Sequence, residues 1–417
     1  MKVLWFANTP CNADEYFNTE LKGTGGWLKA LDIELQNHVD LHVAFYYSRN
    51  IKPFTFKKTK YYPIYTPKTT FQKIKNIIVP SVINREHIDI YKAIVDEVKP
   101  DIIHIHGTEN PFGYIITETN IPVVISIQGI ITVYYHRFLS GLGNKYLSTK
   151  IFSIKKPLEF FKPYKIIYRQ FNLMMKREQE ILKNAKHIIG RTDWDYSVTR
   201  VLAPNSRYYH VDEILRESFY ENAGKWQPHT RDKLIVFTTT GPSYYKGLET
   251  ACQALWELQN IGVDVEWRFA GINGNDLIVK IVKKYLGQKY PKFCLKYLGK
   301  LNDRMLITQM LESDIYVMPS HIENSPNNLC EAMMLGMPCI ASFSGGTSSM
   351  LNNKVEGVLI QDGDPWVLAG SILDYINKKE KYIEYGINAY KRASKRHKIN
   401  NIVSNLIKNY SQIISFV

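Results

Sequence analysis

Residues 313–342 read SDIYVMPSHIENSPNNLCEAMMLGMPCIAS, a pattern typical of a buried strand, a polar loop and a short helix. The loop carries Glu323, and the apolar run after it carries Glu331, eight positions later. A helix start has unpaired backbone N–H groups and a partial positive charge, which together favour an anion. Two carboxylates beside such a start suit a ligand with both hydroxyl and phosphate groups. Glu331, in the expected first turn, could instead simply balance the helix dipole.

The rest of the chain repeats this alternation of strand and amphipathic helix. Alternation of this kind predicts parallel sheets covered by helices on both faces. We therefore expect an α/β fold of two doubly wound, Rossmann-like domains that face each other across a cleft, where the ligand binds. The expected strands span residues 2–7, 39–46, 101–106, 122–128, 185–191, 233–240, 265–271, 293–299, 313–320, 338–343 and 357–361.

The polar segment YENAGKWQPHTRD interrupts this alternation and suggests a boundary between the domains. We predict an N-terminal, acceptor-side domain at 1–218, a linker at 219–232 and a C-terminal, donor-binding domain at 233–394. Residues 395–417 are predicted to form a C-terminal helix that packs back on the N-terminal domain.

The composition indicates a soluble, cytoplasmic protein. The five cysteines are odd in number and form no CxxC pair, which argues against disulfides and a zinc site. The N-terminus turns polar too early for a signal peptide, and no apolar run reaches the roughly 18 residues that a membrane span needs.

The net charge of +14 is concentrated in two segments that are also rich in aromatic residues. Residues 51–75 carry seven lysines and no acid, and residues 145–169 carry seven basic residues and one glutamate. Such segments are typical of a surface that rests on anionic lipid, although two solvated loops would have the same composition. No nucleic-acid-binding motif accompanies them, so we predict no nucleic-acid partner.

The segment 298–365 resembles the E-x7-E region of the retaining GT-B glycosyltransferases, above all glycosyltransferase family 4. The motif lies between MPS and SGG, and EAMMLGMPCIAS continues the family pattern. The resemblance implies that Glu323 contacts the donor sugar and that Glu331 binds the nucleotide ribose. The amides of Asn327, Asn328 and Leu329 would hold the sugar and diphosphate. It also implies metal-independent chemistry without a cofactor, because amides and cations replace a metal at the leaving diphosphate.

A second element of the resemblance is TTTGPSYYKGLETACQAL at 238–255. In the family an arginine and a lysine in this region grip the diphosphate. Lys246 matches the lysine and is the second expected catalytic residue, whereas Gly241 occupies the position of the arginine. Arg191, Arg216 or a helix N-terminus could compensate for the missing cation.

The N-terminal half offers weaker candidates. Gly25 and Gly26, in the loop after the first strand, let the backbone approach a phosphate closely, and the resemblance favours contact with the donor. Gln128 stands where many family members have a histidine, so it can bind a sugar hydroxyl but cannot shuttle a proton. His106 and Arg191 are candidates for acceptor or phosphate contacts. His104 and His106 form an HxH pair, which favours a packed pocket wall over a metal site.

The resemblance implies transfer of a sugar from a nucleotide-sugar donor to a hydroxyl of a glycan or lipid-linked acceptor, in surface or capsular polysaccharide synthesis. Two other functions remain open. One is a sugar-nucleotide epimerase or hydrolase with the same fold. The other is a non-catalytic nucleotide-sugar-binding protein, which the absent arginine and histidine would permit. The sequence identifies neither the sugar nor the acceptor.

Overall fold

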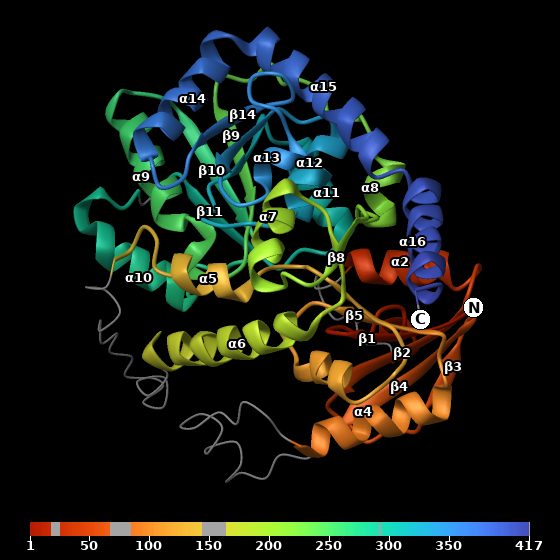
Figure 1. The fold of residues 1–417 in the computed structure, drawn as a ribbon. Helices are drawn as coiled ribbons and strands as arrows, with labels where there is room; N and C mark the ends of the chain where they lie inside the picture. The colour runs from red at the N-terminus through yellow and green to blue at the C-terminus, as the bar shows by residue number, and fades with distance from the viewer. Residues whose placement is uncertain (18–25, 67–84, 144–163, 292, 417) are drawn as a thin grey trace. The chain divides into compact units, whose positions relative to one another are not determined.

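The computed structural model describes residues 1–17, 26–66, 85–143, 164–291 and 293–416 (Figure 1). These residues form two compact units. The first unit comprises 1–135, 166–216 and 397–417, and the second comprises 136–165 and 217–396. Each unit contains one mainly parallel sheet with helices packed on it, so the predicted α/β class with two doubly wound, Rossmann-like domains is confirmed.

The sheet of the first unit has the strand order β3-β4-β2-β1-β5-β6-β7-β8. All neighbouring strands are parallel except β3 and β4, which form an antiparallel hairpin at one edge. The strands are β1 (Lys2–Ala7), β2 (Asp40–Tyr47), β3 (Phe54–Phe56), β4 (Thr59–Tyr65), β5 (Ile102–His106), β6 (Val123–Ser126), β7 (His187–Gly190) and β8 (Arg207–His210).

The central strands of this sheet are buried on both faces. Residues 3–7 of β1 have no exposed surface, which explains their unbroken apolar sequence VLWFA. The helices with described residues in this unit are α1 (Ala13–Tyr16), α2 (Gly26–Leu35), α4 (Arg85–Val98), the 3₁₀ helix η1 (Pro111–Thr117), α5 (Ile131–Arg137), α6 (Tyr164–Asn184), α7 (Asp193–Leu202) and α16 (Ile399–Ile414).

The C-terminal helix α16 is part of the first unit and lies beside α2 (Figure 1). Its Tyr410 is fully buried, and the Tyr410 hydroxyl accepts a hydrogen bond from the Trp5 indole at 3.1 Å. The same hydroxyl lies 2.5 Å from Nδ1 of His104, whose Nε2 lies 2.5 Å from the hydroxyl of Ser126. Burial lowers the pKa of His104 to about 3, so the ring is neutral and donates one of these two hydrogen bonds and accepts the other.

The sheet of the second unit has the order β11-β10-β9-β12-β13-β14, and all its strands are parallel. Counted from β9, this is the common doubly wound order 3-2-1-4-5-6, in which the direction of winding reverses between β9 and β12. The strands are β9 (Leu234–Thr239), β10 (Val265–Ala270), β11 (Leu295–Gly299), β12 (Ile315–Met318), β13 (Cys339–Phe343) and β14 (Val358–Gln361).

The helices of the second unit follow the strands in turn. Several begin with the caps expected from their sequence; the Asp364 carboxylate, for example, accepts from the amides of Trp366 and Val367 at the start of α14. The helices are α8 (Glu217–Glu221), η4 (Tyr244–Lys246), α9 (Leu248–Asn260), α10 (Leu277–Leu286), η5 (Gly287–Lys289), α11 (Asp303–Leu311), α12 (Asn327–Leu335), α13 (Thr347–Met350), α14 (Pro365–Asn377) and α15 (Lys379–Arg396).

The division of the chain differs from the predicted bounds in two places. Residues 136–165 group with the second unit, so the first unit is not one continuous segment. The predicted linker, 219–232, packs on the second unit as part of it. Trp226 is buried there, and its indole donates to the Ser313 carbonyl at 2.8 Å. The polar composition of this segment concealed its two buried aromatic residues, Phe219 and Trp226.

The basic segment 51–75 is partly explained by the fold. Its described residues, 51–66, include the β3–β4 hairpin, which the sequence analysis missed. Tyr61 and Tyr62 of β4 are buried in the sheet, so these aromatic side chains belong to the core and not to a lipid-facing surface. Residues 67–75 of this segment, and 145–163 of the other, lie outside the described residues. Strand β8 was also missed.

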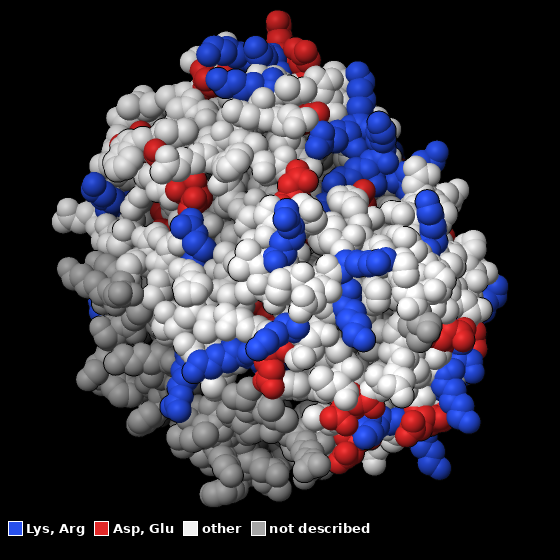
Figure 2. All heavy atoms as spheres, in the orientation of Figure 1, with Lys and Arg blue, Asp and Glu red and all other residues white. Residues whose placement is uncertain are grey.

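The charged residues form local pairs on much of the described surface. Figure 2 shows Lys and Arg side chains interspersed with Asp and Glu on the face that it draws. Lys57 lies 3.0 Å from Glu15, and Lys60 lies 3.2 Å from Glu97. Among the described residues, no helix is both long enough and apolar enough to cross a membrane.

The Tyr410 network predicts a specific loss of stability. Tyr410→Phe keeps the packing of the ring but leaves the buried Trp5 N–H and the His104 Nδ1 without their partner. We expect a loss of about 1–3 kcal/mol, measured as a lower midpoint of urea-induced unfolding. The control Tyr196→Phe removes the hydroxyl from a tyrosine that is 41% exposed and should leave the midpoint unchanged. Equal midpoints for Tyr410→Phe and the wild type would contradict this assignment.

Candidate active site

Lys246 and Glu323 meet at the point where the strand order of the second unit reverses. Lys246 ends η4, in the loop after β9, and Glu323 lies in the loop after β12. These two strands are neighbours, and their following helices leave the sheet on opposite faces, which opens a crevice at their carboxyl ends. The sequence analysis singled out both residues separately, and the structure brings them together.

The two side chains form a partly buried ion pair. Nζ of Lys246 lies 2.6 Å from Oε1 of Glu323, whose side chain is 8% exposed. Burial disfavours the charge of Lys246, and the Glu323 carboxylate more than offsets this effect, so the pKa of Lys246 is raised above its ordinary value. The ammonium group therefore stays charged and can serve a second anion.

The backbone holds the two loops in close contact. Gly247 has φ +70°, and a Cβ at this position would lie 1.9 Å from the Pro319 carbonyl oxygen. The His321 amide donates to the Tyr245 carbonyl at 2.8 Å, and the Gly346 amide donates to the Glu323 carbonyl at 3.0 Å. The loop that carries Glu323 is therefore fixed from both sides by its neighbours.

Helix α12 starts beside this pair. Pro326 precedes it and provides no side-chain cap, but the Leu329 amide is engaged, since it donates to the Pro326 carbonyl at 3.0 Å and to Asn328 Oδ1 at 3.1 Å. The Asn328 side chain donates to the Thr239 carbonyl at 2.9 Å, which ties the helix start to the end of β9. Oδ1 of Asn327 is buried and has no hydrogen-bond partner. Among the described residues, no acceptor contacts the amides of Asn327 and Asn328, so the helix start offers these two donors and the unpaired Asn327 oxygen.

Glu331 lies deeper in α12 than predicted. It is the fifth residue of the helix, whose first turn holds no acidic residue, so it does not sit where it would balance the helix dipole best. Its side chain is buried, and its charge and that of Glu323 both add to the effect of burial in raising the pKa of Tyr316. Both carboxylates of the motif therefore lie near one buried tyrosine of β12.

Gly241, where the resemblance leads one to expect an arginine, faces open space. No heavy atom lies within 4 Å of a Cβ built at this position. The structure therefore leaves room for the missing side chain and does not fill the space with another residue. Arg191 lies in the first unit and is engaged there, as described next.

Trp27, which the sequence did not indicate, contacts the candidates His106 and Arg191 at the carboxyl edge of the first sheet. His106 is fully buried at the end of β5, with its ring 5.8 Å from that of Trp27. The guanidinium of Arg191, just after β7, stacks on Trp27 at 4.1 Å and lies 3.7 Å from Glu213. Trp27 was missed because an aromatic residue at a helix start is usually a packing residue.

The remaining candidates of the first unit have clear positions. Gly26 begins α2, and a Cβ there would lie 2.8 Å from side-chain carbons of Arg216. Gln128 follows β6 and is partly exposed. Gly25 lies outside the described residues. Arg191 is followed by Thr192, which caps α7: its hydroxyl accepts from the Asp195 amide.

A polar group that the sequence analysis did not single out lies where the first sheet reverses its order, between β1 and β5. The Asn8 amide donates to Oε2 of Glu109 at 2.6 Å, and the Asn110 amide donates to Oδ1 of Asn8 at 2.6 Å. Burial raises the pKa of Glu109 above its ordinary value. The sequence did contain an indication of this group, because Asn8 and Glu109 each follow a predicted strand at its carboxyl end, where ligands of such sheets bind.

Comparison with known proteins agrees with this geometry. Residues 220–392 match the family model described as glycosyl transferases group 1. Over 137 residues the chain is 30% identical to the UDP-Gal:alpha-D-GlcNAc-diphosphoundecaprenol alpha-1,3-galactosyltransferase of Escherichia coli. The aligned region makes up 30% of this chain and 35% of that protein. Over 134 residues it is 28% identical to the amylovoran biosynthesis glycosyltransferase AmsK of Erwinia amylovora. This aligned region makes up 31% of this chain and 32% of AmsK. These matches span about a third of the length of the relatives.

The whole chain resembles the solved structure of sucrose-phosphate synthase from Thermosynechococcus elongatus. The TM-score is 0.72 at 14% identity, over 100% of this chain and 99% of that one. The chain therefore has the GT-B fold. The region matched by the family model contains both glutamates of the motif, Lys246 and the start of α12.

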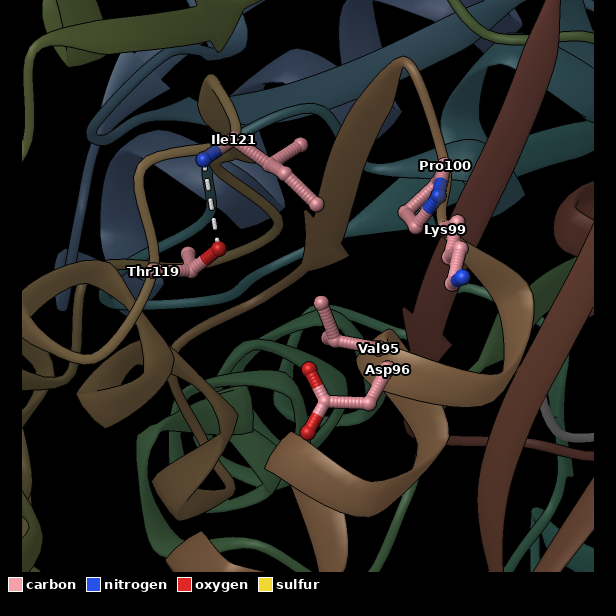
Figure 3. A pocket seen from close by; sticks show the side chains of 6 residues that line it. All are labelled: Val95, Asp96, Lys99, Pro100, Thr119 and Ile121. Carbon is pink, nitrogen blue, oxygen red and sulfur yellow. Dashed lines mark hydrogen bonds between the residues drawn. The ribbon is translucent and has the colours of Figure 1, made fainter.

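Two surface pockets lie away from the Lys246–Glu323 pair and the start of α12. One, of 440 Å³, lies in the first unit beneath the amino-terminal ends of β5 and β6, the opposite end from the carboxyl edge (Figure 3). Val95 and Lys99 line one side of it, and Thr119 accepts a hydrogen bond from the Ile121 amide on the other. The second, of 760 Å³, borders α7, β8 and α16.

The contact between Gly247 and Pro319 can be tested without a ligand. Gly262 also has a positive φ, +82°, but no atom lies near its Cβ position, so it is a matched control. We expect Gly262→Ala to lower stability by about 1–2 kcal/mol through backbone strain alone. Gly247→Ala should lower it further, because the methyl group must also displace the Pro319 carbonyl. Chemical unfolding measures both, and equal losses would show that the close approach does not matter.

Proposed function

We propose that this chain is a metal-independent, retaining glycosyltransferase of family 4 type. In this proposal it transfers a hexosyl group from a nucleotide sugar to a hydroxyl of a glycan or lipid-linked acceptor. The observation that carries the proposal is the Lys246–Glu323 ion pair beside the uncapped start of α12, at the reversal of the second sheet.

The donor diphosphate would lie against cations and amides. A nucleotide sugar carries two negative charges where the sugar is attached, and these charges grow on the leaving group as the bond breaks. The ammonium of Lys246 and the amides of Asn327–Leu329 are the positive groups at this edge of the unit. They would stabilise the leaving diphosphate without a metal ion. Asn327 Oδ1, buried and unpaired, could accept from a sugar hydroxyl.

The two glutamates would fix the sugar and the ribose. Glu323 has a second carboxylate oxygen beyond the one that contacts Lys246, and this oxygen could accept a hydrogen bond from a sugar hydroxyl. Glu331 would accept from the ribose hydroxyls, as the family resemblance implies. Retention would follow if the acceptor hydroxyl attacked from the face that the diphosphate leaves. The bond from C1 to the phosphate oxygen then breaks, the bond to the acceptor oxygen forms, and the departing phosphate takes the acceptor proton.

The acceptor would bind the first unit. Its carboxyl edge offers polar groups at Asn8, Glu109 and Gln128 beside the stacked Trp27 and Arg191 side chains, a mixture that suits a sugar. Gln128 in place of a histidine is compatible with this mechanism, because the leaving phosphate serves as the base. The E. coli relative is named for a diphosphoundecaprenol-linked acceptor, and AmsK for polysaccharide synthesis. The name of the E. coli relative favours a lipid-linked glycan as the acceptor, with UDP-galactose a natural first donor to test.

The proposal predicts a ligand-dependent rise in melting temperature. Among UDP-, GDP- and ADP-linked sugars, we expect at least one to stabilise the wild type, because a ligand that binds only the folded state raises its melting point. Glu323→Gln and Glu331→Gln should each reduce this shift and lower the transfer rate about 100-fold or more, in line with lost charged contacts. Excess EDTA should leave transfer unchanged, and NMR of the product should show the anomeric configuration of the donor.

The control is Glu384→Gln, which neutralises an exposed glutamate on α15. It should behave as the wild type. Stabilisation and turnover unaffected by both motif variants would refute the assignment of this site. Epimer formation or water-only turnover would favour the epimerase or hydrolase, and binding without any transfer would favour the non-catalytic alternative.

An acceptor in a lipid phase would bring the protein to a membrane surface, and we propose that basic residues of 51–75 and 145–169 make this contact. We expect the wild type to sediment with vesicles that contain anionic phospholipid at low salt, and to be released as salt screens the attraction. Vesicles of neutral lipid are the control. Failure to sediment with anionic vesicles at low salt would count against the membrane contact but not against the donor site.

A further inference from the structure

A buried charged cluster lies beside the Lys246–Glu323 pair. Nε2 of His321 lies 2.5 Å from Oε1 of Glu249, and Nδ1 lies 3.3 Å from Oδ2 of Asp362. His321 is 1% exposed and Glu249 is 2% exposed. Arg137 forms an ion pair with the other side of the cluster, at Asp362, and also donates to the His321 carbonyl. None of these four residues was singled out from the sequence.

The geometry requires a charged imidazole. Carboxylates only accept hydrogen bonds, so a ring that contacts one at each nitrogen must carry a proton on both. Burial by itself lowers the pKa of His321, but the hydrogen bonds and charges of Asp362 and Glu249 outweigh it and raise the pKa to about 9. Reciprocally, the His321 and Arg137 charges hold the pKa of Asp362 below its ordinary value despite burial.

The cluster connects the same two loops as the candidate catalytic pair. His321 is two residues before Glu323, and Glu249 is three residues after Lys246. The His321 amide also donates to the Tyr245 carbonyl, one residue before Lys246. Asp362, just after β14, adds a third loop. Movement of His321 would therefore move the backbone that carries Glu323 relative to the backbone that carries Lys246.

The segment around Gly141 covers the cluster. A Cβ at Gly141 would lie 2.1 Å from Oε1 of Glu249 and 2.6 Å from Nε2 of His321. This close approach of backbone leaves little room for water at the hydrogen bond. A buried charge pair that loses one partner leaves the other charge uncompensated, which is strongly unfavourable. Neutral His321 would leave the buried Glu249 carboxylate without its charged partner, whereas the partly exposed Asp362 would keep its ion pair with Arg137.

We propose that His321 is a positioning residue: held as an imidazolium between Glu249 and Asp362, it fixes the Glu323 loop against Lys246 for donor binding. This inference rests on the proposed function for its role, but its structural claim can be tested without a donor. The charged groups around His321 are Glu249 on α9, Asp362 after β14 and Arg137 on α5. Lys246 and Glu323 are the charged residues of the two loops that the cluster connects.

The expected pH dependence follows from the raised pKa. Stability due to the charged His321 is fully present below the ordinary histidine pKa of about 6.5 and is lost as the pH rises through about 9. The melting-temperature difference between wild type and His321→Asn should therefore shrink between these two values. NMR of ring-labelled histidine should show that His321 titrates near pH 9. Glu249→Gln removes one carboxylate and should move this titration to lower pH.

The deciding measurement is hydrogen exchange of the free protein at pH 7.5. His321→Asn and Glu249→Gln should speed exchange in peptides covering 319–326 by about tenfold or more, while α15 stays unchanged. His229→Asn is the matched control, since His229 lies in the same unit and its side chain hydrogen-bonds the Leu311 carbonyl, outside this cluster. Unchanged exchange at 319–326 in both variants, or titration of His321 near 6.5, would overturn the inference.

The outcome for donor binding is separate. If the loop loosens and a stabilising nucleotide sugar has been found, Kd for that donor should rise in His321→Asn more than kcat falls. If the loop loosens but no nucleotide sugar stabilises the wild type, the proposed function fails and the structural role of His321 stands. If a donor binds the wild type but the loop is unaffected by both variants, the positioning role fails and the proposed function stands.

Discussion

The ion pair between Lys246 and Glu323 depends on one constraint, the order of strands in the second sheet. Only because β9 and β12 are neighbours do a lysine and a glutamate 77 residues apart in the sequence lie 2.6 Å from each other. Gly247 then permits the two loops to touch, since any side chain there would collide with the Pro319 carbonyl. The amides of α12 complete an electropositive edge with a carboxylate inside it.

Charge balance explains why this edge can exist without a ligand. Lys246 is neutralised by Glu323, and His321 is neutralised by Glu249 and Asp362, so each buried charge has a partner at short distance. A diphosphate that approached Lys246 would share or replace the Glu323 contact, which frees the carboxylate for the sugar. The same pair could therefore hold the two loops together and receive the donor.

Much of the fold was predictable because buried parallel strands have unbroken apolar sequences. VLWFA of β1 and IYVM of β12 were placed to within two residues for this reason. The β3–β4 hairpin was not, since β4 contains Lys60 and Pro63, and a proline lacks the amide that a ladder uses. Strand β8 has four residues, too few to show a period. Trp226 escaped notice in a polar segment.

The candidate site was predictable only where residues lie close in sequence or match a known motif. Glu323, Glu331 and Lys246 were found in this way. His321 was not, because its partners are 72 and 41 residues away and only the folded sheet brings them to it. Asn8 and Glu109 are separated by 101 residues in the same manner. Distant polar contacts leave no periodic pattern, so a single sequence does not reveal them.

The most direct test of the donor site is hydrogen exchange with and without the nucleotide sugar that stabilises the protein most. The account predicts that, within the second unit, added protection concentrates in peptides covering 240–247 and 319–331. Protection that spared both regions and appeared instead along α7, β8 and α16 would contradict it.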